Sequence, residues 1–418
     1  MTRAAALVAL VLLCAASARA HELDIDDWKF DFKSTLTELV TVNRELRVRF
    51  PDPSDPNALP TLQEAGSLLS TTRLRMELQG RYGDHWSGQL VYDNEFFLGS
   101  GRKSLAFQAA DQLGAPTWLD LDQDIVDSGD LTWRHLLYRG WVKFANDDVE
   151  VVLGRQRIAL GRGQLWNPSD IFNLIPPLAV EQDQRVGVDS LLARAKLADG
   201  LWAALIAAPE KNGDYPRGAL RLELSERAVD AALMVAKIDT ATLIGGDFAT
   251  NLGDAALRGE LTETWYAGDV GPDPKLQAVL SLDYTAPLGA GLYVLVEHFY
   301  NQLVADRASA LAALESPGLS EDSGLRAVGA SRAPQLVTFA RNQTGLQLGY
   351  DLTPLLRANV LWLHDWNGPS EALVPSLVWS PLDTLELSAG VQLFGGNGNR
   401  GEYGGLPTLW ILRADVFF

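Results

Sequence analysis

The sequence predicts an all-β chain that closes into a transmembrane antiparallel β-barrel of about 18 strands, with about 16 as the second choice. Three observations predict this fold class: an apolar N-terminal run followed by small residues, recurring strand-length segments of alternating apolar and polar residues, and a last strand that ends on an aromatic residue. A sheet can cross a membrane only if every backbone N–H and C=O is paired, which requires closure into a barrel.

Residues 1–20 have the pattern of a secretory signal peptide. The apolar run Ala4–Ala16 is followed by the small-residue pattern Ala18-Arg19-Ala20, which predicts cleavage before His21. The run is shorter than the roughly 20 apolar residues that a membrane-spanning helix requires. We therefore expect an exported chain rather than one anchored by a helix.

Composition excludes several kinds of site. Cys14 is the only cysteine and lies within the predicted signal peptide, so a mature barrel of residues 21–418 is expected to contain no disulfide, haem-attachment motif or cysteine metal site. We expect no cofactor and no metal. The net charge of −18 makes nucleic acid a poor partner.

An enzyme is not expected. No G-x-S-x-G nucleophile motif is present. His298 and His364 each have an acidic neighbour in the sequence, but adjacent residues of a strand point to opposite faces, so neither pair forms a catalytic dyad.

Alternating segments of about ten residues recur along the chain, which is the length that a tilted strand needs to cross the hydrocarbon. In "TGLQLGYDL", for example, Leu346, Leu348 and Tyr350 fall on one face. The predicted strands are 28–40, 70–82, 85–97, 131–145, 148–158, 188–198, 201–208, 217–225, 228–237, 241–251, 255–266, 275–286, 290–301, 337–352, 355–365, 371–380, 383–394 and 408–418.

The connections alternate between tight turns, such as Gly83-Asp84 and Asp199-Gly200, and longer loops. Outer-membrane barrels have short periplasmic turns, longer external loops and both chain ends in the periplasm. The tight turns fall on the side of the chain ends, which favours the outer membrane of a Gram-negative bacterium. The expected longer loops are 41–69, 98–130, 159–187, 209–216, 267–274, 302–336 and 395–407.

The C-terminal segment "TLWILRADVFF" alternates apolar and polar residues and ends on Phe418. This ending resembles the terminal strand of bacterial outer-membrane β-barrels, in which a final Phe is the recognition mark for the insertion machinery. The resemblance implies that Phe418 is a membrane-insertion signal and that the insertion machinery, membrane lipid and lipopolysaccharide are partners.

The stretch "LGRQRIALGRGQLWNPSD", Leu153–Asp170, changes from a strand pattern into a Gly-rich loop interrupted by Pro168. A barrel of about 18 strands is too wide to be filled by the side chains of its wall. We therefore expect the third external loop, residues 159–187, to fold into the lumen and narrow a water-filled channel. The loop residues expected at the constriction are Arg162, Trp166, Asp170, Glu181, Asp183 and Arg185.

Gly154-Arg155-Gln156 and Gly161-Arg162-Gly163, with the position of the loop in the strand order, resemble the general porins. In that family the third external loop bends inward, and a Gly-Arg pair leads from strand five into it. A similar "GRQ" followed by Gly occurs in the 18-stranded alginate-export family. The first resemblance implies a passive channel, and the second implies export of a polysaccharide.

Basic residues in the polar phase of the strands are expected to form a wall opposite the acidic loop, setting a transverse field that selects solutes by charge and size. The alternative is that each pairs with an acid of a neighbouring strand, such as Glu77, Glu223, Glu260 or Glu386, without influence on transport. The candidates are Arg73, Arg75, Arg155, Arg157, Arg194, Lys196, Arg221, Arg258, Arg341, Arg357 and Arg413.

The function predicted from the sequence is passive diffusion of small hydrophilic solutes or ions through this lumen. Two alternatives remain open at this point. One is an outer-membrane conduit for polysaccharide export, and the other is a barrel scaffold around a periplasmic or cytochrome partner. A homotrimer is a further expectation, although no segment identifies a subunit interface.

Overall fold

The computed structural model describes residues 21–49, 61–103, 107, 117–129, 131–173, 175–181, 187–209, 217–238, 241–265, 274–302, 338, 340–396 and 401–418. Within these residues the chain forms one antiparallel sheet and a short 3-10 helix, η1 (Ser100–Lys103). The strands are β1 (His21–Ile25), β2 (Trp28–Arg49), β3 (Thr61–Tyr82), β4 (Trp86–Leu98), β5 (Asp122–Ser128), β6 (Leu131–Ala145), β7 (Val149–Gln156), β8 (Val188–Ala198), β9 (Leu201–Ala208), β10 (Arg217–Glu226), β11 (Val229–Ile238), β12 (Ala241–Leu252), β13 (Ala255–Trp265), β14 (Lys275–Ala286), β15 (Leu292–Asn301), β16 (Asn342–Thr353), β17 (Leu356–Asp365), β18 (Ser370–Leu382), β19 (Leu385–Gly396) and β20 (Leu409–Phe417).

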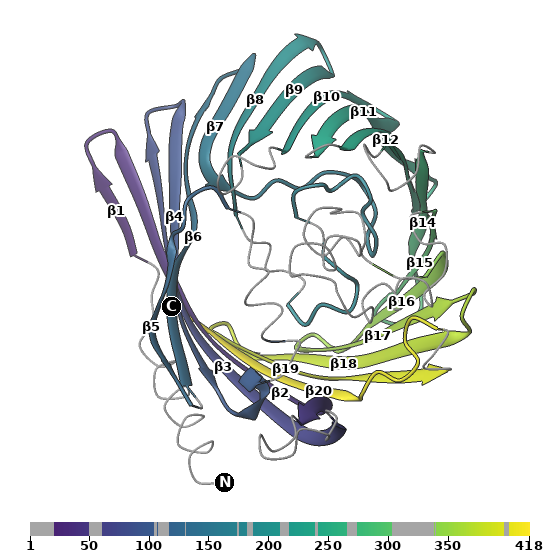
Figure 1. Ribbon diagram of the computed structural model, residues 1–418. Coiled ribbons are helices and arrows are strands. Elements are labelled where there is room, and N and C mark those ends of the chain that lie inside the picture. The colour runs from purple at the N-terminus through teal and green to yellow at the C-terminus, as the bar shows by residue number, and fades with distance from the viewer. Residues whose placement is uncertain are drawn as a thin grey trace.

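The sheet closes because β2 pairs with β3 on one edge and with β20 on the other. β1 and β5 are additions to the ring: β1 forms a hairpin on the first residues of β2, and β5 pairs with β6 beyond the end of β7. The remaining strands form a closed ring of 18, seen nearly end-on in Figure 1. No strand edge of this ring is therefore exposed to lipid.

The prediction of an 18-stranded barrel is confirmed, and every predicted strand overlaps a strand of the ring. The expected loop at 41–69 differs, because β2 and β3 remain paired as far as Arg49 and Thr61. The segment 98–130, expected as a loop, contains η1 and β5. The sequence signal failed there because alternation shows which face is apolar, not where pairing stops beyond the membrane.

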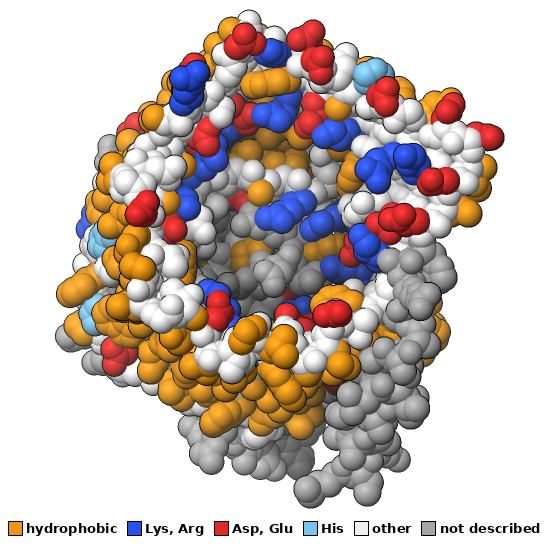
Figure 2. Space-filling view, turned by 180° about the vertical axis from the view of Figure 1, so that it is seen from behind, with side chains coloured by type: hydrophobic (Ala, Val, Ile, Leu, Met, Phe, Trp, Pro, Cys, Tyr) orange, Lys and Arg blue, Asp and Glu red, His pale blue; other side chains and the backbone are white. Residues whose placement is uncertain are grey.

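The two faces of the wall differ in chemistry. The outer face carries exposed apolar side chains, of which Leu233 is 68 % exposed and Leu220 is 62 % exposed. Residues of the opposite phase, such as Arg221 and Asp247, are 6 % and 4 % exposed and face inward. Figure 2 shows the hollowed end of the ring, with basic and acidic side chains around its inner rim and hydrophobic ones outside. Within the described residues, no helix has the length and hydropathy to cross a membrane.

Phe418 lies at the seam where the ring closes. Its N–H donates to the Ser34 carbonyl at 2.8 Å, and its carbonyl accepts from the Ser34 N–H at 3.2 Å. Its side chain packs near Leu385 and Val416, both buried. The last residue thus completes the pairing between β20 and β2.

Candidate functional site: the segment within the barrel and its facing wall

The chain leaves the wall after Gln156, at the end of β7, and Figure 1 shows the following segment inside the ring. Gly154 and Gly161 flank the departure with φ angles of +124° and +83°, a region that side chains rarely adopt. At Gly161 a Cβ atom would also collide with Asn167 and with the Glu260 carboxylate. These two glycines therefore permit both the exit and the close approach to the far wall. Residues 157–173 and 175–181 are called the inner segment below.

Glu297, on the inward face of β15, binds the inner segment through three consecutive backbone N–H groups. Its Oε2 accepts from Gln164 at 2.7 Å, and its Oε1 accepts from Leu165 at 2.9 Å and from Trp166 at 2.7 Å. The carboxylate is 0 % exposed. Three backbone hydrogen bonds to one buried carboxyl group, each contributing about 0.5–1.5 kcal/mol, fix the segment to β15.

Glu260, on β13, binds the same segment on either side of that contact. Its carboxylate accepts from the backbone N–H groups of Arg162 and Gly163 and, at 3.1 Å, from that of Ser169. It is 4 % exposed. The expected alternative, that Glu260 neutralises a wall arginine, does not describe its contacts. Glu260 and Glu297 instead act as a pair of acceptors that holds residues 162–169, and this pair is called the carboxylate latch.

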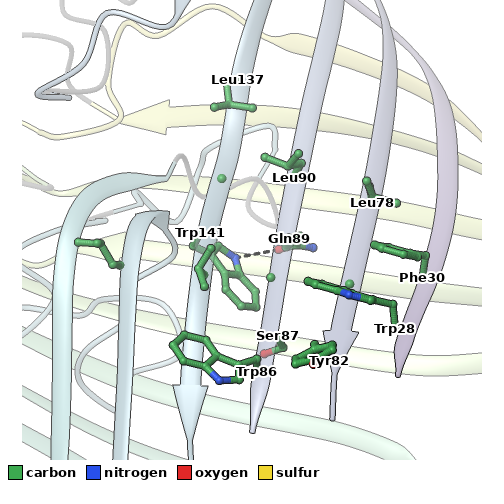
Figure 3. Close-up of a pocket in the computed structure, with 15 residues that line it drawn as sticks. Trp28, Phe30, Leu78, Tyr82, Trp86, Ser87, Gln89, Leu90, Leu137 and Trp141 are labelled. Carbon is green, nitrogen blue, oxygen red and sulfur yellow. Dashed lines mark hydrogen bonds between the residues drawn. The ribbon is translucent and has the colours of Figure 1, made fainter. Parts of the chain in front are cut away.

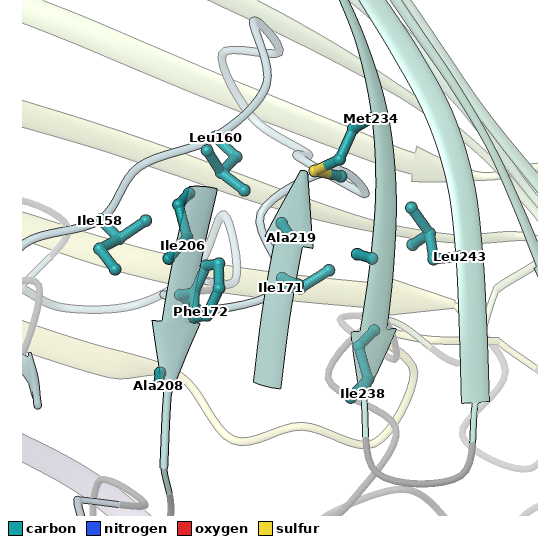
Figure 4. Close-up of a cluster of buried hydrophobic side chains, with 11 residues drawn as sticks. Ile158, Leu160, Ile171, Phe172, Ile206, Ala208, Ala219, Met234, Ile238 and Leu243 are labelled. Carbon is teal, nitrogen blue, oxygen red and sulfur yellow. The ribbon is translucent and has the colours of Figure 1, made fainter. Parts of the chain in front are cut away.

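Apolar packing attaches the inner segment to the inward face of strands β8 to β12. Ile171 is fully buried and Phe172 is 6 % exposed, and both pack against Ile206, Met234 and neighbours (Figure 4). The cluster comprises Ile158, Leu160, Ile171, Phe172, Ile206, Ala208, Ala219, Met234, Ala236, Ile238 and Leu243. The inward face of these strands is thus covered by the segment rather than by water.

Trp166 continues this attachment toward β15. Its ring is 1 % exposed and stacks on Phe299, with centroids 5.8 Å apart. It belongs to a second buried cluster that includes Leu295 and Leu363. Trp166 therefore anchors the segment and offers almost no surface to a solute.

Asp170 was expected to present negative charge to the lumen, but it is 1 % exposed. Its Oδ1 accepts from the backbone N–H groups of Asn173 at 2.9 Å and Phe172 at 3.3 Å. Residues 167–170 form a turn here, and the Asp170 carboxylate caps the backbone N–H groups that follow it.

A charged wall formed by β3, β4 and β20 faces the end of the inner segment. Arg73 donates from Nε to Glu95 at 2.7 Å and, through both terminal nitrogens, to Glu181 at 2.7 and 3.0 Å. Arg75 pairs with Asp93 at 2.6 Å, and Arg413 pairs with Asp415 at 2.7 Å. The inner segment is therefore joined to the charged wall through Arg73.

Glu181 has a pKa below its ordinary value. Burial acts to raise the pKa, but the hydrogen bonds and positive charge of Arg73 outweigh it, and Arg413 and Arg75 lower it further. Its carboxylate is therefore ionised at neutral pH and remains paired with Arg73.

Other predicted wall residues are also ion-paired. Arg221 contacts Asp247 at 2.7 Å and Arg162 of the inner segment contacts the same acid at 3.3 Å. The remaining pairs are Arg194 with Glu223, Arg258 with Asp283, Arg357 with Asp351 and Lys196 with Asp199. The alternative in which wall arginines pair with neighbouring acids thus describes these contacts, although Glu77 and Glu386 are not among the partners in these pairs.

Arg155 is enclosed by protein. It is 4 % exposed, pairs with Asp189 at 2.9 Å and donates to the Leu137 and Leu119 carbonyls. Its role in the structure is to join β6, β8 and the segment before β5 where β7 ends.

Four further predicted residues complete the set. Arg157 is exposed, and the Arg341 guanidinium lies 5.9 Å from the Tyr300 ring centroid. Asp183 and Arg185 lie outside the described residues. Within the described part of the chain, no group of His, Cys, Asp and Glu is placed to hold a metal ion.

The sequence reasoning missed the latch. Glu297 was considered only as a neighbour of His298, and Glu260 only as a partner for arginine. A signal was present in β15: Glu297 lies on the same face of the strand as the apolar residues Leu295 and Phe299. A buried carboxylate in such surroundings needs donors from elsewhere in the chain.

No protein-family model matches the sequence, and no curated protein matches it significantly. Among solved structures, OccAB1 of Acinetobacter baumannii is similar with a TM-score of 0.52 and 12 % identity, over 94 % of this chain and 97 % of that chain. The outer membrane protein OpdK of Pseudomonas aeruginosa gives a TM-score of 0.52 and 11 % identity, over 93 % and 98 %. OccK5 (OpdH) of the same species gives a TM-score of 0.50 and 13 % identity, over 93 % of this chain and 98 % of that chain. At these identities the likeness concerns the fold: the chain is a closed antiparallel β-barrel similar to those that these proteins form.

Proposed function

We propose that this chain is an outer-membrane channel for small hydrophilic solutes, narrowed by the inner segment. The observation that carries the proposal is the closed ring of 18 strands with a charged inward wall on one side and an attached segment on the other. Eighteen strands enclose more space than wall side chains can fill. The space left beside the segment is bordered by charged groups, which favour water and polar solutes.

The passage in this proposal runs along the wall of β3, β4 and β20, beside the point where Glu181 of the inner segment contacts Arg73. Arg73, Arg75 and Arg413 border it, each beside an acid. Paired charges of both signs present hydrogen-bond donors and acceptors to a solute without a large net field. We infer that size and polarity, more than net charge, decide which solutes pass.

The other elements of the proposal follow from the sequence. Residues 1–20 are a signal peptide, residues 21–418 the mature barrel and Phe418 its insertion signal. The partners are lipid, lipopolysaccharide and the insertion machinery, with a homotrimer or a periplasmic protein as a further partner. Of the residues expected at the constriction, Arg155, Trp166 and Asp170 are buried and are left out of the proposal, and the described contacts give Arg162 and Glu181 the largest part.

Planar-bilayer recording of the purified mature chain tests the proposal. We expect stepwise ion conductance from the protein alone, together with uptake of small sugars or amino acids into liposomes that contain it. A protein that inserts but conducts only when a periplasmic partner is added would instead support the export conduit or the scaffold.

A further inference from the structure

The outer face of β2, β3, β4, β6 and β7 contains a hollow of about 770 Å³ beside the ends of the strands that carry the tight turns. Figure 3 shows Trp28, Tyr82 and Trp86 along one side of it and Leu78, Leu90 and Leu137 along the other. Its size falls within the roughly 300–1,000 Å³ typical of small-molecule sites.

Register explains why the wall is hollowed here. Phe30, Gly80, Gly88, Val142 and Leu153 lie in one row across five neighbouring strands. The two glycines at its centre leave a gap between larger side chains. The row belongs to the outer face, because Val142 is 56 % exposed and Leu153 is 63 % exposed. The hollow is thus built into the membrane-facing surface.

A row of aromatic residues sets the depth of the hollow. This row lies two residues nearer the strand ends than the row of Gly80 and Gly88, which corresponds to about 6–7 Å along a strand. Its members pair across neighbouring strands and are Trp28, Tyr82, Trp86 and Phe144. Such aromatic rows mark the level of the lipid headgroups. The hollow therefore begins where the acyl chains of the periplasmic leaflet begin.

Acidic residues border the headgroup side. Asp26 and Asp27 lie in the turn before β2 and Asp84 lies in the turn before β4, and all three are exposed. The two turns are linked, since the Gly83 N–H donates to the Asp27 carbonyl at 3.2 Å. The nearest basic residues, Lys29 and Arg81, share the inward phase of β2 and β3. The border of the hollow therefore complements a cationic group.

Two indole groups add hydrogen-bond donors at the same level. Trp28 is 45 % exposed and Trp86 is 49 % exposed, so both rings are accessible from the membrane side. Figure 3 shows the Trp86 nitrogen at the end of the ring that points away from Leu90, toward the strand ends. An indole N–H in that position can donate to a lipid phosphate.

We propose that this hollow is a binding site for one phospholipid with a primary ammonium headgroup, of the phosphatidylethanolamine class. An acyl chain fills the gap over Gly80 and Gly88, the indole groups meet the phosphate, and the carboxylates of Asp27 and Asp84 attract the ammonium. The site faces away from the lumen, so it is independent of the solute passage.

Native mass spectrometry of the full mature protein tests this site. The protein in detergent is incubated with an equimolar mixture of phosphatidylethanolamine and phosphatidylglycerol that carry the same acyl chains. We expect one retained lipid, with phosphatidylethanolamine favoured roughly three- to five-fold, as an exposed ion pair can supply. Equal retention of both lipids, or no retained lipid, would overturn the proposal.

Variants separate the two parts of the site. Gly80→Leu fills the gap at a position where the nearest atoms belong to the movable Phe30 ring, 3.2 Å from an added Cβ, and should abolish lipid retention. Asp27→Asn with Asp84→Asn should keep retention but remove the preference between headgroups. Gly246→Leu fills a second outer hollow of about 660 Å³ lined by strands from β9 to β14, which has no indole in its lining, and serves as the control; an added Cβ there lies 3.0 Å from the Ala232 carbonyl oxygen.

The same samples test the competing occupant. A dimer that Gly80→Leu dissociates would assign the hollow to a second copy of the chain and overturn the lipid assignment. Because these residues lie outside the lumen, all three variants should keep wild-type conductance in planar bilayers. The proposal of a lipid site and the proposal of a channel can therefore be disproved independently of each other.

Discussion

The two sides of the lumen follow the same alternation but carry opposite chemistry. On β9 to β12 the inward positions hold Ile206, Ala219, Met234 and Leu243, and the inner segment covers them. On β3, β4 and β20 the inward positions hold arginines paired with acids. The difference shows that an inward-facing strand position need not be polar: apolar side chains of the inner segment lie against one side, and acids, among them Glu181 of the segment, lie against the other.

The carboxylate latch lies between these two regions. Glu260 and Glu297 are acidic residues, like Glu95 and Asp93 of the charged wall, but their partners are backbone N–H groups of the segment. Their role is therefore positional. The latch fixes residues 162–169 of the segment against β13 and β15.

Breaking the latch should have the largest effect. Glu260→Gln with Glu297→Gln replaces one acceptor oxygen of each carboxyl group by an NH2 group that cannot accept from the backbone, weakening the attachment of the segment by roughly 2–6 kcal/mol in total. We expect higher single-channel conductance and passage of larger sugars, measured in planar bilayers and by liposome swelling. Glu223→Gln is the control, because the described ion pairs of Glu223 are with Arg194 and Arg221. Equal effects from the control would remove the latch from the account.

The apolar attachment should be the next most sensitive. Phe172→Ala removes a 6 % exposed ring from the covered side and should cost about 3–5 kcal/mol, less if the cluster closes over the space. We expect a lower apparent unfolding temperature and noisier open-channel current. Leu233→Ala, on the outer face of β11, removes a 68 % exposed side chain and should change neither.

The charged side should respond in ion selectivity. Arg73→Gln leaves Glu95 and Glu181 without their shared guanidinium, so the passage becomes more negative. Reversal potentials measured in a salt gradient should shift toward cation preference. Arg357→Gln is the control, because its side chain is 44 % exposed and pairs with Asp351 alone among described acids. A shift of the same size in the control would contradict a special role for Arg73.

The smallest effect concerns pH. The pKa of Glu181 lies below the ordinary value of 4.5, because Arg73 stabilises the ionised form against the effect of burial. The Arg73–Glu181 attachment is therefore complete above pH 4.5 and is lost only as the pH falls through the lowered pKa. Open-channel noise of the wild type should rise once the pH falls below the lowered pKa of Glu181. Glu181→Gln should show the increased noise at every pH.

The fold could be predicted from the sequence because membrane strands are long, alternate strictly and are separated by turn residues. β5 could not, since "DQDIVDS" has no continuous alternation and forms a strand only because β7 ends early and leaves an edge of β6 open. β2 and β3 exceed the predicted length because pairing continues past the membrane.

Part of the site could also be predicted. The place where the chain leaves the wall was readable from Gly154 and Gly161, whose φ angles are positive as a sharp exit requires. The buried positions of Asp170 and Arg155 could not be predicted. Whether a charged side chain faces water or backbone groups depends on how the chain packs around it. For the same reason, the hydrogen bonds of Glu297 with the inner segment could not be predicted.

The most direct test of the central claim, a wet lumen beside a lipid-facing outer wall, uses two adjacent residues of β3. Gln79 and Leu78 are both exposed but point to opposite faces, and Cys14, the only cysteine, lies within the predicted signal peptide. Each is replaced by cysteine and treated with a charged, membrane-impermeant thiol reagent during planar-bilayer recording. The reagent should change the conductance of Gln79→Cys at once and leave that of Leu78→Cys unchanged. Modification of both channels alike, or of neither, would contradict the account.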